Sequence, residues 1–219
     1  MKDLIKETVE VKTHGSFLLS TPKGGESSTL LLGFHGYKES SSDMMEQLRG
    51  MPGADKLWLA TAEAVHRFYN RDGKVVASWM TSADRELAIA DNLFYVKTVV
   101  EQLNSRCSGV ERLIYLGFSQ GASMAYRAAF LGEHSSAGVV AFAGDLPGEI
   151  NKNSLRYRPK TLICRGLNDK LFNEEQIKKD FSAVTALSVE CEIAEFEGEH
   201  AWNPAVLKIV SDFVGSLSR

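Results

Sequence analysis

The sequence predicts an α/β fold in which helices flank a central, mostly parallel sheet on both faces. Three observations support this prediction. Short apolar runs alternate with longer amphipathic stretches, as they do in chains built from β-α-β units. The 219 residues are 44% hydrophobic and 24% charged, the ordinary balance of a globular protein with a sizeable core. No repeat, low-complexity tract or linker divides the chain, so we expect residues 1–219 to form a single domain.

Six apolar runs have the length and composition of buried strands. A looser alternation over residues 10–21 predicts an antiparallel strand at an edge of the sheet. The turn-forming sequence Asn70-Arg71-Asp72-Gly73 predicts that residues 70–82 fold as a hairpin over that edge. The six predicted core strands are residues 29–34, 56–61, 112–118, 137–142, 161–165 and 189–196.

Three stretches between the strands carry clear helix signals. Residues 84–104 place apolar side chains on one face and predict a long amphipathic helix. Asn173 is placed to cap a helix that runs to about residue 186, with Gln176 reaching back to the cap. Asn203 followed by Pro204 predicts the start of a last helix near the C-terminus.

The charge and hydropathy of the chain exclude several classes of function. The net charge of −3 and the pI near 6.0 argue against a general affinity for nucleic acids or acidic membranes. The longest apolar runs are too short to span a bilayer. Residues 1–19 are charged throughout and do not look like a signal peptide, so we expect a cytoplasmic protein.

The cysteines and histidines do not indicate a metal site. Cys164 and Cys191 lie in apolar, strand-like runs and are expected to be buried, reduced thiols. Cys107, beside a serine and a glycine, is expected to lie in a loop and to be more exposed. No Cys/His cluster has metal-ligand spacing, so we expect neither a metal nor another cofactor.

The strongest candidate for chemistry is Ser119, in the segment Gly117-Phe118-Ser119-Gln120-Gly121. This segment has the G-x-S-x-G pattern, and its context supports a nucleophile elbow because an apolar strand runs into it and a helix-forming segment follows it. Such a turn presents the serine at the carboxyl end of the sheet and points the helix N-terminus at the reacting centre. A glycine-flanked turn with an incidental serine is the alternative interpretation. The flanking strand and helix favour the nucleophile.

A serine hydroxyl needs a base that removes its proton as it attacks. Of the five histidines, His200 follows the last predicted strand on the loop before the C-terminal helix, where it can reach a serine raised at the middle of the sheet. His35 directly follows a strand and is expected to shape a turn. The others are expected to be surface or hydrogen-bonded histidines: His14, His66 and His134.

An acid that orients the base should lie between serine and histidine in the chain. Asp169 follows the predicted strand 161–165 and is the favoured candidate. Asp145 follows the preceding strand and is its rival. Asp180 belongs to a predicted helix and is expected to be solvated. The oxyanion of the reaction needs two backbone N–H donors, for which we predict Tyr37, in the loop after the first core strand, and Gln120.

Taken together, these segments resemble the phospholipase/carboxylesterase family of small α/β-hydrolases, which includes acyl-protein thioesterases and bacterial carboxylesterases. The resemblance implies an α/β-hydrolase fold without a large lid. It also implies that Ser119, Asp169 and His200 form a catalytic triad, with the amides of Tyr37 and Gln120 as oxyanion donors. It spans nearly the whole chain and is carried by His35-Gly36, Trp79 and residues 117–121, 166–169 and 198–200.

The sequence departs from the family pattern near the expected acyl pocket. Tyr37-Lys38-Glu39 replaces the small-residue turn that usually follows His-Gly, and Met80-Thr81 replaces the aromatic and acidic residues that often follow the tryptophan. Aromatic and thioether side chains on these loops suggest an apolar pocket near the nucleophile, although such residues are about as often simple packing. The candidate pocket residues are Tyr37, Trp79, Met80 and Trp202.

We therefore expect a serine hydrolase that cleaves carboxylic esters or thioesters of short to medium acyl chains through an acyl-enzyme. Its partner is a small acyl substrate. A peptidase or an acyltransferase with the same triad is the main alternative among enzymes. A non-catalytic binding module that kept the fold is a further alternative, which the three filled triad positions disfavour.

Overall fold

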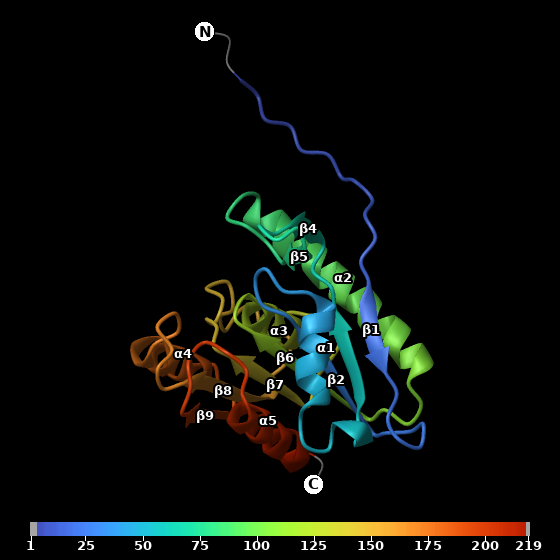
Figure 1. The fold of residues 1–219 in the computed structure, drawn as a ribbon. Helices are drawn as coiled ribbons and strands as arrows, with labels where there is room; N and C mark the ends of the chain where they lie inside the picture. Colours follow the sequence, from blue (N-terminus) through green and yellow to red (C-terminus); the bar gives the residue numbers. More distant parts are fainter. Residues whose placement is uncertain (1–3, 218–219) are drawn as a thin grey trace.

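A seven-stranded sheet forms the centre of the protein in the computed structural model, which describes residues 4–217 (Figure 1). The ends of the predicted domain, residues 1–3 and 218–219, lie outside the described residues. The spatial order is β1-β3-β2-β6-β7-β8-β9, and every neighbouring pair is parallel except β1 with β3. The strands are β1 (Phe17–Ser20), β2 (Thr29–Phe34), β3 (Trp58–Ala62), β6 (Arg112–Phe118), β7 (Gly138–Phe142), β8 (Lys160–Gly166) and β9 (Cys191–Phe196).

The mostly parallel sheet confirms the predicted fold class. All six predicted core strands are present, and β2 is buried along its whole length, as expected for a strand covered on both faces. The strand β3 begins later than predicted because Ala54–Lys56 forms a short 3-10 helix, η1. The predicted edge strand is antiparallel, as expected, but only Phe17–Ser20 pairs with β3.

Helices cover both faces of the sheet (Figure 1). The helices α1 (Ser41–Arg49) and α5 (Pro204–Ser216) lie in front of it, and α2 (Arg85–Arg106) and α3 (Gln120–Phe130) lie behind it. A further helix, α4 (Glu174–Ala186), packs against β8 and β9. This arrangement buries both faces of the parallel strands and leaves their carboxyl ends to carry loops.

The caps of these helices follow the sequence signals. Asn173 accepts a hydrogen bond from the N–H of Gln176, and the Gln176 side chain accepts one from the N–H of Asn173, which is the predicted capping box. Asn203 caps α5. The helix α1 was not predicted, although a second capping box, between Ser40 and Asp43, marks its start.

A hairpin with the predicted turn is present as a separate two-stranded sheet, but it spans residues 66–78 instead of the predicted 70–82. It consists of β4 (His66–Tyr69) and β5 (Val75–Ser78), and the Asn70 side chain closes its turn by accepting two backbone hydrogen bonds. The N–H of Ala77, in β5, donates to the carbonyl oxygen of Glu39 at 2.9 Å. The hairpin therefore holds the loop that follows β2.

The three cysteines are free thiols, and two of them are more buried than a reactive thiol would be. Cys107 lies just outside α2, as expected, but the expectation that it is exposed is wrong, because its side chain packs at the C-terminal end of this helix with 5% exposure. Burial raises the pKa of the Cys107 thiol, raises that of Cys164 further, and raises the pKa of Cys191 to about 12. These thiols are therefore poorly suited to act as nucleophiles, since the thiolate is the reactive form.

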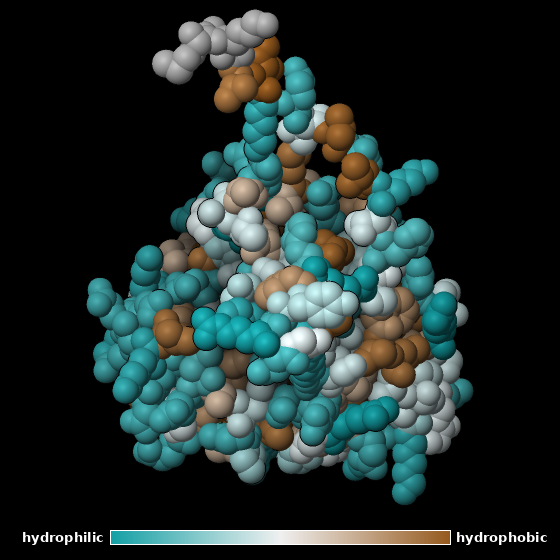
Figure 2. All heavy atoms as spheres, turned by 45° about the horizontal axis from the view of Figure 1, so that its top comes forward, coloured by the Kyte–Doolittle hydropathy of each residue, from teal (hydrophilic) through white to brown (hydrophobic). Residues whose placement is uncertain are grey.

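Residues 4–16 leave the body of the protein as an extended, exposed segment (Figure 1). Its apolar side chains stand apart from the core, as Figure 2 shows. Within residues 4–217, no helix combines the length and the hydropathy that crossing a membrane requires.

Candidate active site

Ser119 lies at the sharp turn between β6 and α3, at the carboxyl end of the sheet. Its φ and ψ are 54° and −120°, a strained conformation that residues with a Cβ rarely adopt. The Ser119 N–H donates to the carbonyl oxygen of Phe142 at 2.8 Å, and its own carbonyl oxygen accepts from the N–H of Ala122 at 2.9 Å. These backbone bonds hold the strained residue in place.

The two glycines of the motif make room for this turn. A Cβ on Gly117 would lie 2.0 Å from the carbonyl oxygen of Gly121, and a Cβ on Gly121 would lie 2.1 Å from the carbonyl oxygen of Phe34, at the end of β2. The opposing atoms belong to the backbone, which cannot rotate away as a side chain can. The glycines at both ends of the motif are therefore required by the contact between β6, α3 and the end of β2.

Asp169 and His200, on the loops after β8 and β9, form a hydrogen bond. His200 Nδ1 lies 2.8 Å from Asp169 Oδ2. The Asp169 side chain is completely buried, and its other oxygen accepts the N–H groups of Leu171 at 2.8 Å and Phe172 at 2.9 Å. A carboxylate held in this way orients the imidazole and leaves Nε2 to accept a proton.

The His200 ring lies beside the nucleophile elbow. Its centroid is 5.0 Å from that of Phe118, the residue that precedes Ser119. Among the hydrogen bonds of residues 4–217, none joins Ser119 Oγ to His200 Nε2. Bonds between a nucleophile and its base are often long in the absence of substrate and tighten when it binds.

The two rival carboxylates do not contact a histidine. Asp145 is exposed, and its side chain accepts a hydrogen bond from Gln176 Nε2 at 3.3 Å. The expectation that Asp180 is solvated is wrong, because its side chain is buried and accepts the N–H of Leu146 at 2.7 Å. Burial raises the pKa of Asp180 to about 6. Asp169 is the acid candidate that the fold brings to His200.

The other histidines have different surroundings. His35 is buried, with Nδ1 at 2.8 Å from the carbonyl oxygen of Gly36 and Nε2 accepting the N–H of Ala64 at 3.1 Å. Burial lowers the pKa of His35, which favours the neutral ring that these bonds require. His35 thus holds the turn after β2. The remaining three are exposed or half-buried, and their rings hydrogen-bond to no group of residues 4–217: His14, His66 and His134.

The loop after β2 carries the first of the two predicted oxyanion donors. The N–H of Gly36 donates to Glu39 Oε2 at 2.7 Å, which closes the loop on itself. The N–H of Tyr37 has no hydrogen-bond acceptor within residues 4–217. The N–H of Gln120 is the first of α3, where backbone donors have no partner within the helix. Both amides are thus available to a substrate oxygen.

The Gln120 side chain ties the elbow to the segment after β5. Its Oε1 accepts the N–H of Trp79 at 2.9 Å, and its Nε2 donates to the carbonyl oxygen of Met80 at 2.9 Å. The Trp79 side chain has no exposed surface, and its Nε1 donates to the carbonyl oxygen of His35 at 2.9 Å. The prediction that Trp79 lines the acyl pocket is therefore wrong, because this side chain supports the loop after β2 from inside the core. The Met80 side chain, the next predicted pocket residue, is also largely buried, with 8% exposure.

Two of the predicted pocket residues do keep accessible surface. Trp202 is half-buried, and its ring packs against those of Phe118, at 5.6 Å, and Phe142, at 4.9 Å. Tyr37 is 52% exposed and contacts the Phe68 ring of the hairpin. These aromatic side chains lie on opposite loops of the site, one after β9 and one after β2.

Two leucines near the site were missed by the sequence analysis. Leu167 and Leu171 flank Asp169 on the loop after β8, with 44% and 71% of their surfaces exposed. The sequence signal that could have identified them is their position two residues before and two residues after Asp169. They add apolar surface to the same end of the sheet.

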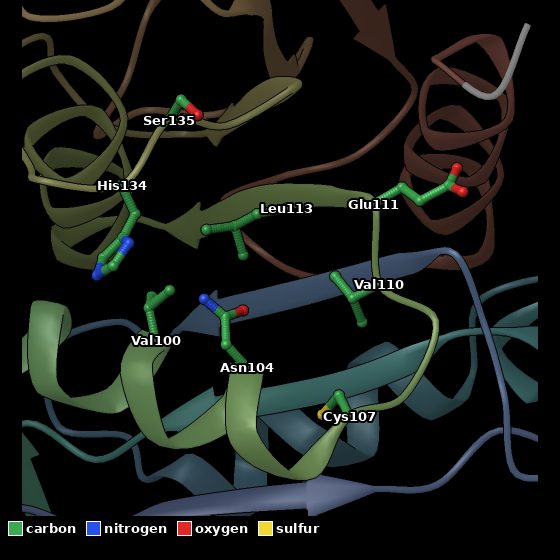
Figure 3. Close-up of a pocket in the computed structure, with 8 residues that line it drawn as sticks. All are labelled: Val100, Asn104, Cys107, Val110, Glu111, Leu113, His134 and Ser135. Carbon is green, nitrogen blue, oxygen red and sulfur yellow. The ribbon is translucent and has the colours of Figure 1, made fainter.

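A cavity of about 310 Å³ lies elsewhere, at the amino end of β6 (Figure 3). It opens to the surface and is bordered by the last turns of α2, the start of β6 and the loop after α3. Since Ser119 follows the carboxyl end of β6, this cavity is separate from the candidate active site. It is lined by Val100, Asn104, Cys107, Val110, Glu111, Leu113, His134 and Ser135.

Solved structures of other proteins share this fold. Esterase PE8 has a TM-score of 0.74 and 19% identity, over 94% of this chain and 100% of its own. Acyl-protein thioesterase 2 from Zea mays has a TM-score of 0.73 and 16% identity, over 93% and 99% of the two chains. SOBER1 from Arabidopsis thaliana has a TM-score of 0.69 and 16% identity, over 87% and 99%. Among curated proteins, no sequence match was found. At these identities the likeness establishes the fold alone.

The family follows from the sequence itself. Residues 21–218 match the sequence profile described as phospholipase/carboxylesterase. The match starts just after β1, runs through α5, and includes the nucleophile elbow and the loops after β8 and β9. The chain therefore belongs to the phospholipase/carboxylesterase family of α/β-hydrolases.

Proposed function

We propose that the protein hydrolyses carboxylic esters or thioesters with Ser119 as nucleophile, His200 as general base and Asp169 as the acid that orients the base. The observation that carries the proposal is the hydrogen bond from His200 to the buried Asp169, formed beside the strained turn that bears Ser119. The family supplies the reaction class, which is hydrolysis of the esterase or thioesterase type.

The first half of the reaction forms an acyl-enzyme. Ser119 Oγ attacks the carbonyl carbon of the substrate while His200 Nε2 takes the hydroxyl proton. The carbonyl oxygen becomes negative and accepts hydrogen bonds from the N–H groups of Tyr37 and Gln120. Collapse of this intermediate breaks the bond to the leaving alcohol or thiol, which takes the proton from His200. In related sites one such oxyanion donor is worth about 10²–10³ in kcat.

The second half releases the acid. A water molecule attacks the acyl carbon, and His200 takes one of its protons. The second intermediate then collapses, Ser119 Oγ leaves as the carboxylic acid forms, and His200 returns the proton to Ser119. Asp169 keeps its charge throughout and stabilises the imidazolium that exists in both halves.

The proposal extends to the size of the acyl group and to the compartment. The apolar surface at this end of the sheet comes from a few side chains, among them half-buried Trp202 and exposed Leu167 and Leu171, so it suits short to medium acyl chains. Three free thiols favour a reducing compartment, so we place the protein in the cytoplasm.

Labelling with a fluorophosphonate probe tests the nucleophile. We expect stoichiometric labelling of the wild type, no labelling of Ser119→Ala, and a loss of turnover on p-nitrophenyl esters of about a thousandfold or more. Ser123→Ala, on the same helix, is the matched control, because Ser123 Oγ only donates to the carbonyl oxygen of Asp145. Labelling of another serine, or unchanged turnover in Ser119→Ala, contradicts the assignment. A panel of esters, acyl-thioesters and peptide amides separates an esterase from a peptidase.

A further inference from the structure

The loop after β2 contains a carboxylate that the reaction above does not use. Glu39 folds back over its own loop, where Oε2 accepts the N–H of Gly36 at 2.7 Å. A Cβ built on Gly36 would lie 3.0 Å from this oxygen and 3.1 Å from the Phe118 ring. The Phe118 ring in turn packs against His200. The carboxylate thus lies against Gly36, and Gly36 also lies next to the Phe118 ring, which contacts the proposed base.

The backbone of Glu39 closes the same loop. Its N–H donates to the carbonyl oxygen of Gly36 at 3.3 Å, and its carbonyl oxygen accepts the N–H of Ala77 at 2.9 Å. The N–H of Lys38 donates to the carbonyl oxygen of Ala77 at 3.1 Å. Every amide of residues 36–39 therefore has an acceptor within residues 4–217, except that of Tyr37, the predicted oxyanion donor.

Charged groups from three other elements face the Glu39 carboxylate. They are Asp43 on α1, Lys74 in the turn of the hairpin, and His200 after β9. Burial raises the pKa of Glu39, with Asp43 adding to the shift, whereas the Gly36 N–H, His200 and Lys74 oppose it. Lys74 already pairs with Asp43 at 2.6 Å.

We propose that Glu39 is a positioning residue for the hydrolysis. Its carboxylate holds the peptide between Gly36 and Tyr37 so that the Tyr37 N–H is directed at the substrate oxygen. The inference rests on the proposed function, because only a reaction that passes through an oxyanion makes use of this amide.

Two substitutions separate the hydrogen-bond acceptor of Glu39 from its charge. In Glu39→Gln the amide oxygen can still accept the Gly36 N–H, but the charge is lost. In Glu39→Ala both the acceptor and the charge are lost. Glu46→Gln is the matched control, since Glu46 is an exposed glutamate on α1 and its substitution changes the net charge by the same amount. For each variant, kcat and KM on p-nitrophenyl acetate are measured from pH 5 to 9, and the fold is checked by thermal unfolding.

We expect Glu39→Gln to keep kcat on the alkaline plateau within about fivefold of the wild type, because the loop remains tied. Glu39→Ala should lose about 10- to 100-fold in kcat, with KM changed less than about threefold, since the oxyanion forms only after binding. Glu46→Gln should match the wild type in both.

Several results would overturn the inference. They are a loss larger than about fivefold in kcat on the alkaline plateau of Glu39→Gln, or a folded Glu39→Ala with kcat within about twofold of the wild type. Should Glu39→Ala fail to fold, the plateau kcat and KM of Glu39→Gln decide alone. Failure of the proposed function looks different, because the wild type itself would then lack both ester turnover and fluorophosphonate labelling at Ser119.

Discussion

Asp169→Asn changes one atom of the candidate triad and leaves its shape intact. In the wild type, Asp169 Oδ1 accepts the amides of Leu171 and Phe172, and Oδ2 bonds to His200 Nδ1 at 2.8 Å. In the variant, the amide oxygen keeps the two backbone bonds and Nδ2 replaces Oδ2. The new NH₂ group donates to His200 Nδ1, so the ring proton moves to Nε2. An imidazole in that tautomer cannot accept the proton of Ser119.

The expected loss in kcat is up to about ten-thousandfold, the scale seen for this change in a related triad. Such a loss corresponds to about 5.5 kcal/mol of transition-state stabilisation. The assay is kcat/KM on p-nitrophenyl acetate, with urea unfolding to show that the variant is folded. Asp145→Asn is the matched control and should lose less than about tenfold, since Asp145 is exposed and contacts Gln176 rather than a histidine. A folded, active Asp169→Asn, or an inactive Asp145→Asn, would refute the reasoning.

Three further predictions concern packing, burial and acyl size. Gly121→Ala should lower the free energy of unfolding by about 3 kcal/mol or more, because its Cβ would lie 2.1 Å from the carbonyl oxygen of Phe34. Gly148→Ala is the control in the same denaturation experiment, because no atom lies near the position of its Cβ. An equal loss of stability in the two variants would contradict the clash. Burial raises the pKa of Asp180 to about 6, so the folded state binds this proton more tightly than the unfolded state does. The stability of the folded state that comes from this protonation is therefore lost as the pH rises through about 6. Asp180→Asn should therefore gain roughly 1–2 kcal/mol over the wild type between pH 4 and pH 7 in urea unfolding, whereas a pH-independent difference would exclude this cause. For acyl esters, kcat/KM should rise about fourfold per methylene and then level off at medium length, and Leu171→Ser should flatten the rise; a steady increase through palmitoyl esters would show that the apolar surface is larger than we infer.

The strands and most helices could be predicted because their signals are local. A run such as residues 29–34 is apolar at every position, and parallel strands buried on both faces require that pattern. Asn173 and Asn203 mark their helix starts through contacts three residues away. The helix α1 carried a comparable cap at Ser40 but a shorter and more polar sequence, so its buried methionines did not stand out.

Three of the errors concern burial, which depends on residues distant in the sequence. Trp79 lies under the loop after β2, Asp180 meets the amide of Leu146, and Cys107 packs where α2 ends. None of these contacts has a sequence signal. For the candidate site, the order of serine, aspartate and histidine along the chain indicated which loops meet, because the carboxyl ends of parallel strands share one edge of the sheet. The chain order could not show that Glu39 folds back onto Gly36, since that contact depends on the turn conformation.

The contact at Gly121 bears on how this protein can acquire new substrates. A Cβ there would lie 2.1 Å from the Phe34 carbonyl oxygen and 2.6 Å from that of His35, so the backbone next to Ser119, the proposed nucleophile, rests directly on the backbone that leads to Tyr37. Neither segment can be moved without the other. Outer side chains such as Leu167 and Leu171 are exposed and can change without disturbing that junction. If the proposed function holds, we expect a combinatorial library confined to these positions to change the acyl preference and to leave the fold of the junction intact.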